Sequence, residues 1–168
     1  VLFRSYALTD HPNILLVSNI QEDGQNIGFA DAGRVWHSDG SYMQQPVATS
    51  MLYALEVPVE HGRALGATEF ASAAAAYEGL ETSVKQQANG RQALHQVAGR
   101  RRAIGTGLGK DRQHEEAQPD AVHPLIRTHP FTGRPYIFVN QGECVEVLGL
   151  DESAGRQLID TLDRKSTR

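Results

Sequence analysis

Residues 123–142, with the sequence HPLIRTHPFTGRPYIFVNQG, constrain the fold more than any other part of this 168-residue chain. Two apolar runs, PLIRTH and PYIFVN, lie on either side of the turn-forming residues PFTGR. Runs that are rich in β-branched and aromatic residues and are separated by a short loop containing glycine are typical of a β-hairpin. The segment therefore predicts two antiparallel strands within a strand-rich body.

Shorter patterns predict the other elements. Apolar, β-branched runs favour strands, and a serine or an acidic residue before an alanine- or leucine-rich run favours the start of a helix. We expect strands over residues 13–20, 48–57, 68–70 and 93–99, and helices over residues 72–80 (with Ser72 as N-cap), 81–90 and 151–162. Residues 21–33 and 60–67 are expected to be loops, and residues 99–120 are polar without a hydrophobic period. The predicted fold class is mainly β with flanking helices (α+β).

Composition excludes several classes of protein. Hydrophobic residues make up 40% of the chain and charged residues 21%, which is typical of one globular domain. A net charge of -4 argues against nucleic acid as a partner, and we expect the local basic cluster at residues 100–102 to be a solvated surface. No apolar run approaches membrane-spanning length. Cys144, the single cysteine, cannot form an intrachain disulfide, so we expect a packed thiol in a cytoplasmic protein.

The two ends of the chain have an unusual character. The strings VLFRS and DRKSTR are also what common sequencing adapters encode. We therefore expect residues 1–5 and 163–168 to be non-native, and residues 6–162 to be a partial domain from a longer protein. Natural coding sequence that continues through these ends would contradict this expectation.

The stretch RVWHSDGSY, residues 34–42, places His37 and Asp39 one residue apart. A shuffled chain of this composition would contain roughly one such pair, and His114 with Glu116 supplies another in a polar stretch. The pair could order a loop as an Asx-turn does. On a strand, however, alternate side chains share a face, about 6–7 Å apart. They could then bind one ion, as in the two-His-one-carboxylate sites of non-heme Fe(II) oxygenases.

Three blocks resemble a known family. The segments VWHSDGSYMQQPVATSMLYALEVP, TEFASAAAAYEGL and HPLIRTHPFTGRPYIFVNQG are similar to the taurine dioxygenase and aryloxyalkanoate dioxygenase family, from about His11 to Leu162. The resemblance implies a double-stranded β-helix (jelly-roll), incomplete in this chain. It also implies an Fe(II)- and 2-oxoglutarate-dependent dioxygenase that uses O2 to hydroxylate a small organic, anionic substrate and releases succinate and CO2.

The resemblance also implies roles for single residues. His37 and Asp39 match two iron ligands, Trp36 matches the aromatic residue before them, and Thr68 matches a threonine that binds 2-oxoglutarate. A three-residue insertion precedes Thr68, where Ala67 replaces the family's aspartate. Where taurine-specific members carry an asparagine and an aromatic residue, this chain has Gly33 and Glu143. These two departures argue against taurine as the substrate.

The family's third iron ligand and its 2-oxoglutarate-binding arginine belong to a later segment, so we expect the chain to be inactive on its own. His95, His123 and His129 are the remaining candidates for a ligand, and structural roles are favoured for them, as for the loop residues His11 and His61. The aromatic residues expected in the core are Tyr53, Phe70, Tyr77, Tyr136 and Phe138.

Two other classes of function remain open. One is a metal-binding β-barrel hydrolase or isomerase, and the other is a non-catalytic module that retains the fold. The identity of the metal and 2-oxoglutarate-dependent release of succinate separate these classes from a dioxygenase. The expected partners are a small-molecule substrate, 2-oxoglutarate and O2, and a homo-oligomer remains open.

Overall fold

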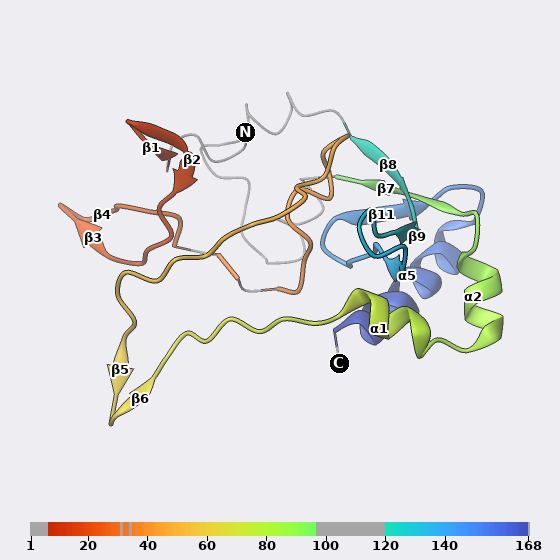
Figure 1. The fold of residues 1–168 in the computed structure, drawn as a ribbon. Coiled ribbons are helices and arrows are strands. Elements are labelled where there is room, and N and C mark those ends of the chain that lie inside the picture. Colours follow the sequence, from red (N-terminus) through yellow and green to blue (C-terminus); the bar gives the residue numbers. More distant parts are fainter. Residues whose placement is uncertain (1–6, 31, 34, 97–119, 168) are drawn as a thin grey trace.

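The computed structural model describes residues 7–30, 32–33, 35–96 and 120–167 (Figure 1). The first part of the chain contains three two-stranded hairpins: β1 (Ala7–Leu8) with β2 (His11–Leu15), β3 (Gln21–Glu22) with β4 (Gln25–Asn26), and β5 (Val59–Glu60) with β6 (Arg63–Ala64). The second part contains α1 (Ala73–Glu78), α2 (Thr82–Ala88), β7 (Gln92–His95), β8 (Ala121–Pro124), β9 (Ile126–Thr128), β10 (Pro135–Ile137), β11 (Cys144–Val147) and α5 (Glu152–Ser166).

The second part is built on an antiparallel sheet in the order β11-β7-β8. The predicted hairpin at residues 123–142 is confirmed, because β9 and β10 pair antiparallel with Ile126 opposite Ile137. Its turn closes where the Gly133 amide donates to the His129 carbonyl at 2.9 Å. Gly133 has a φ of 67°, in the left-handed region that glycine tolerates best. The predicted strand at residues 93–99 is confirmed as β7 up to His95, and residues 97–99 lie outside the described part.

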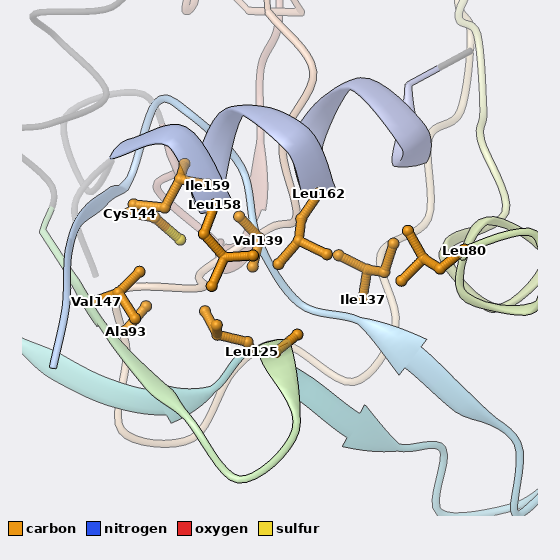
Figure 2. Close-up of a cluster of buried hydrophobic side chains, with 11 residues drawn as sticks. Leu80, Ala93, Leu125, Ile137, Val139, Cys144, Val147, Leu158, Ile159 and Leu162 are labelled. Carbon is orange, nitrogen blue, oxygen red and sulfur yellow. The ribbon is translucent and has the colours of Figure 1, made fainter. Parts of the chain in front are cut away.

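The hydrophobic core lies between this sheet and α5, as Figure 2 shows. The helix contributes Leu158, Ile159 and Leu162, which are all at least 95% buried. They pack toward Val147 of β11 and Leu125, which follows β8. Helix α1 packs against β10 and α5, and Leu80 after it closes one end of the core. All the residues of this buried cluster come from the chain after α1 begins.

The predicted helices are confirmed, and α1 and α5 also have their predicted caps. The Ser72 hydroxyl accepts a hydrogen bond from the Ala75 amide at 3.2 Å and starts α1. The Asp151 carboxylate accepts one from the Ala154 amide at 3.0 Å and starts α5. These bonds satisfy backbone donors that have no partner inside the helix. Helix α5 continues to Ser166, four residues beyond the predicted end at residue 162.

The predictions for residues 48–57 and 68–70 are wrong, because both segments are irregular and exposed. A strand needs a neighbour for its backbone hydrogen bonds, and these segments pair with none of the described strands. The side chain of Tyr53 is 80% exposed and that of Phe70 is 87% exposed, so neither belongs to the core. Two predicted loops instead contain the short hairpins β3–β4 and β5–β6, and His11 begins β2.

The α+β class is therefore confirmed, but with small sheets. The described strands form one three-stranded and four two-stranded sheets, and these do not close into a jelly-roll. Residues 1–5, the basic cluster at 100–102 and the pair His114 and Glu116 lie outside the described residues. Within the described part, the helices are all too short or too polar to cross a membrane.

Candidate functional site

The side chains of His37 and Asp39 converge, although they do not lie on a strand as predicted. They occupy an irregular loop that runs into a turn at Asp39. The Nε2 atom of His37 lies 3.2 Å from Oδ1 of Asp39, and the two side chains are 22% and 50% exposed. A loop can bring such a pair closer together than the alternating positions of an extended strand. Both groups can therefore reach one small ion from the same side.

The surroundings of the pair fix which atoms face the site. The Nδ1 atom of His37 lies 2.8 Å from the Val35 carbonyl oxygen. A carbonyl only accepts, so Nδ1 carries the hydrogen and Nε2 keeps its lone pair when the ring is neutral. The hydroxyl of Ser50 donates to Oδ2 of Asp39 at 2.5 Å. Orienting bonds of this kind accompany metal-binding histidines and carboxylates.

A metal ion fits this donor set. The lone pair of His37 Nε2 and the Asp39 Oδ1 atom both carry negative charge density at 3.2 Å from each other. A shared proton or cation is what makes such an approach favourable. Imidazole nitrogen together with carboxylate oxygen suits Fe(II) and similar divalent ions. Across the residues that the structure describes, however, no three His, Cys, Asp or Glu side chains gather in a metal-binding group.

The turn after the pair depends on glycine. Gly40 has a φ of 64°, and its carbonyl accepts from the Met43 amide at 2.9 Å. A Cβ at this position would lie 2.9 Å from the Met43 sulfur and 3.0 Å from Cγ2 of Val47. Both the backbone conformation and the available space therefore require glycine here. This turn directs the chain from Asp39 back toward the sheet.

The other candidate histidines make separate contacts. His95 is buried on β7, where its ring stacks on Phe138 with 5.4 Å between the ring centroids. Burial, followed by the charges of His123 and Arg127, lowers the pKa of His95 to about 4. His123 is also buried and bonds the Met43 carbonyl oxygen. His129 accepts from the backbone amides that follow it in the hairpin turn.

Cys144 lies beside a histidine, a contact that no local sequence pattern predicts. Its sulfur lies 3.4 Å from Nε2 of His95. Burial, as the largest effect, raises the pKa of the Cys144 thiol to about 12. A protonated thiol is a poor nucleophile. The packing role predicted for Cys144 is confirmed, since the residue is fully buried in the core.

Thr68 lies on an exposed stretch between β6 and α1 (Figure 1). Trp36, directly before His37, is 39% exposed and lines a cleft of about 790 Å³. Phe70 and Ser72 line the same cleft, so the stretch after Thr68 borders the tryptophan next to the site. Sequence reasoning missed Ser50, because nothing in the local pattern distinguishes a serine that orients a carboxylate from a solvated one.

The family model for the taurine catabolism dioxygenase TauD, TfdA family matches residues 3–168. The chain belongs to this family. Pentalenolactone F synthase of Streptomyces arenae is 32% identical over 94% of this chain and 55% of its own length. The alpha-ketoglutarate-dependent 2,4-dichlorophenoxyacetate dioxygenase of Cupriavidus pinatubonensis is 32% identical over 99% of this chain and 56% of its own length. The chain thus spans about half the length of these curated relatives.

Solved structures agree with this assignment. A crystal structure of a candidate alpha-ketoglutarate dependent 2,4-D dioxygenase from Burkholderia xenovorans matches with a TM-score of 0.64 and 27% identity. The match covers 81% of this chain and 50% of that chain. AAD-2 in complex with Mn(II) and N-oxalylglycine matches with a TM-score of 0.62 at 22% identity, over 81% of this chain and 52% of that chain. The second likeness bears on the fold alone.

Proposed function

We propose that this chain provides two iron ligands, His37 and Asp39, of an Fe(II)- and 2-oxoglutarate-dependent dioxygenase. The convergence of His37 Nε2 and Asp39 Oδ1 at 3.2 Å, with the tautomer and the carboxylate oriented by Val35 and Ser50, carries the proposal. Membership of the TauD, TfdA family supports it. The whole protein would hydroxylate a small organic, anionic substrate with release of succinate and CO2.

Each residue at the proposed iron site would have a separate role. His37 and Asp39 would hold the iron, which with 2-oxoglutarate and O2 supplies the oxidising chemistry. Ser50 holds one carboxylate oxygen of Asp39, so the other stays directed toward His37. Trp36, directly before His37, lines the cleft, where it would exclude water from a bound substrate. We also propose Thr68 as a contact for 2-oxoglutarate.

The name of one relative supports the proposed substrate class. One relative at 32% identity is named for 2,4-dichlorophenoxyacetate, a small aromatic carboxylate. Gly33 and Glu143 stand where taurine-specific members carry an asparagine and an aromatic residue, which disfavours taurine. We further propose that the small sheets belong to a jelly-roll that additional strands complete, and that the protein acts in a reducing, cytoplasmic setting.

The test uses the whole protein and the variants His37→Ala and Asp39→Ala. Each substitution removes one of the few protein ligands, so both Mn(II) binding and Fe(II)-dependent succinate release should be lost. His129→Ala is the matched control, because this histidine lies in an exposed turn away from the pair. An iron-loaded His37→Ala protein that forms succinate at the unmodified rate would contradict the assignment. Binding of zinc without any use of 2-oxoglutarate would favour a hydrolase.

Thr68 is tested separately. Thr68→Val keeps the size of the side chain and removes the hydroxyl, and losing a hydrogen bond to a charged group costs about 1.5–3 kcal/mol. The KM for 2-oxoglutarate should rise roughly ten- to a hundredfold. An unchanged KM would show that Thr68 does not contact 2-oxoglutarate. The proposed roles of His37 and Asp39 would not be affected by that result.

A further inference from the structure

A buried polar cluster lies directly behind the turn that carries His37 and Asp39. It consists of Ser41, His95, Asn140 and Glu143, and each of these residues is at least 96% buried. Ser41 comes from the turn itself, His95 from β7, and the other two from the loop before β11. Four polar side chains with so little solvent access need partners among themselves. Their placement joins the turn to the core sheet.

The side-chain hydrogen bonds of the cluster lead to the Glu143 carboxylate. The Ser41 hydroxyl donates to Oε2 of Glu143. Because that hydroxyl has a single hydrogen, its 3.0 Å contact with Nδ1 of His95 is one in which the imidazole donates. The Asn140 amide also donates to Oε2 of Glu143, at 3.3 Å, and its side-chain oxygen accepts from the Glu143 backbone amide at 2.8 Å. Ser41 is thus held by one acceptor and one donor.

The ring of His95 also packs on Cys144. The Cys144 sulfur lies 3.4 Å from Nε2 and 3.6 Å from Nδ1 of His95, so it rests against the imidazole as a whole and does not face one nitrogen. The Cys144 backbone amide donates to the Asn140 carbonyl at 3.1 Å. These contacts fix the orientation of the imidazole that donates to Ser41. The hydrogen bond between His95 and Ser41 therefore depends on β7 and β11 together.

A second set of bonds holds the same turn two and three residues later. Nε2 of His123, on β8, donates to the Met43 carbonyl at 2.9 Å. The side-chain amide of Gln44 donates to the Asp120 carbonyl at 3.0 Å. The turn is thus bonded to His123 of β8 and to Asp120 before it, and through Ser41 to β7 and to the loop before β11. Ser41 is the anchor nearest the proposed ligands, only two residues after Asp39.

We propose that Ser41, Glu143 and His95 form a positioning network that holds the His37–Asp39 turn in its metal-binding geometry. The inference rests on the proposed function and extends it to residues that would not touch the metal. The pair is 22% and 50% exposed and lies on irregular chain, so regular secondary structure does not fix its geometry. The network supplies that constraint from the rigid sheet, as outer residues around metal sites commonly do.

The experiment measures the Kd for Mn(II) of the whole protein, by electron paramagnetic resonance of the free ion, well below the unfolding temperature. We expect Ser41→Ala and Glu143→Gln each to raise the Kd roughly 10- to 100-fold. The double variant should raise it less than the product of the two single effects, because both changes break the same contact. Ser41→Thr retains the hydroxyl and should restore much of the affinity.

Three controls separate positioning from general destabilisation. Glu146→Gln removes the same charge from an exposed position on β11, and Ser153→Ala removes a hydroxyl from an exposed position on α5. Both should leave the Kd unchanged. Leu158→Ala weakens the core beneath α5 and should lower the melting temperature of the metal-free protein without changing the Kd of the folded form. If Ser41 had only a structural role, Ser41→Ala would behave like Leu158→Ala, with a lower melting temperature and an unchanged Kd.

The outcomes are distinguishable. If the unmodified protein binds no Mn(II), the proposed function fails and this inference fails with it. If the unmodified protein binds Mn(II) and Ser41→Ala binds it equally well, the positioning network alone is overturned. A weaker Kd in Ser41→Ala and Glu143→Gln, with unchanged values in the three controls, supports the network.

Discussion

At the scale of single residues, His95 sits where its imidazole must stay neutral. It is 99% buried and is surrounded by His123, Arg127, Cys144 and the Ser41–Glu143 pair. Burial is the main cause that lowers its pKa from 6.5 to about 4. The unfolded chain therefore binds more protons than the folded chain between these two pH values. Folding stability must rise with pH across this window and fall as the pH drops through it.

We predict that the free energy of unfolding falls by about 3 kcal/mol between pH 6.5 and pH 4 through this group alone, since one pKa unit corresponds to about 1.4 kcal/mol. Urea denaturation at a series of pH values measures the effect. His95→Gln should flatten the slope in this window even though it also lowers stability overall. A slope that is the same in the unmodified protein and in His95→Gln would contradict the assignment.

The residues of the candidate site could be predicted from the sequence only in part. His37 and Asp39 could be predicted because metal chemistry demands their types at short spacing, and the structure brings them together. Ser41 and Glu143 could not, because the contact between them joins positions 102 residues apart, and no local pattern records such a distance. Tyr53 was wrongly assigned to the core, because hydrophobicity alone does not show whether other chain covers a residue.

At the scale of elements, Gly155 is a weak point inside α5. Glycine in a helix interior costs about 0.5–1 kcal/mol relative to alanine. A Cβ built at this position would lie 3.5 Å from the Val147 amide nitrogen and 3.6 Å from the Val147 Cβ, which is ordinary contact. We predict that Gly155→Ala raises the free energy of unfolding by up to about 1 kcal/mol. Chemical denaturation measures this change.

The matched control is Gly155→Val. Its two additional methyl groups would enter the space that Val147 already fills, so stability should fall by about 1–3 kcal/mol. If Gly155→Ala lowered stability as much as Gly155→Val, helix α5 would have to pack more closely on β11 than the distances to Val147 indicate. That result would contradict the prediction.

Residues 48–57 are the segment whose structure was predicted least well from the sequence, because the expected strand does not form. Met51, Tyr53 and Leu55 are 93%, 80% and 81% exposed, in a continuous apolar run, MLYAL, that suits a buried strand. Helices and hairpins were predictable because their caps and turns are local, whereas a strand forms only when a distant partner meets its edge. An exposed apolar segment with high strand propensity promotes self-association.

We predict that this segment drives association of the 168-residue chain at high concentration. Leu55→Lys should shift the chain toward the monomer in light scattering, without lowering the free energy of unfolding by more than about 0.5 kcal/mol, because the side chain is exposed. Gln45→Lys adds the same charge at an exposed polar position and is the control. Equal effects of the two substitutions would point to net charge rather than to the segment.

At the scale of the whole molecule, the buried hydrophobic core is unevenly distributed along the described chain. The buried hydrophobic cluster draws on residues from Leu80 to Leu162, while the hairpins before α1 lie apart from the sheet (Figure 1). The loop that carries His37 and Asp39 belongs to the poorly covered part but is fastened to the well-packed part through Ser41. The proposed metal site thus depends on a few polar anchors between the two.

This arrangement predicts a gradient of amide hydrogen exchange. The slowest amides should lie in β7, because this strand pairs with β11 on one side and β8 on the other and contributes Ala93 and His95 to the buried interior. Amides of residues 48–57 should exchange orders of magnitude faster, since their side chains are exposed and no described strand pairs with them. Mass spectrometry of peptides from the deuterated chain measures both.

The Ser41 anchor adds a sharper test of the same gradient. If the polar cluster fastens the turn to the sheet, peptides that cover residues 37–44 should exchange more slowly than residues 48–57, although both are irregular chain. Ser41→Ala should speed exchange at residues 37–44 and leave β7 unchanged. Residues 48–57 could also exchange as slowly as β7. That result would show that this segment packs against a partner in solution, and it would contradict the uneven distribution of the core.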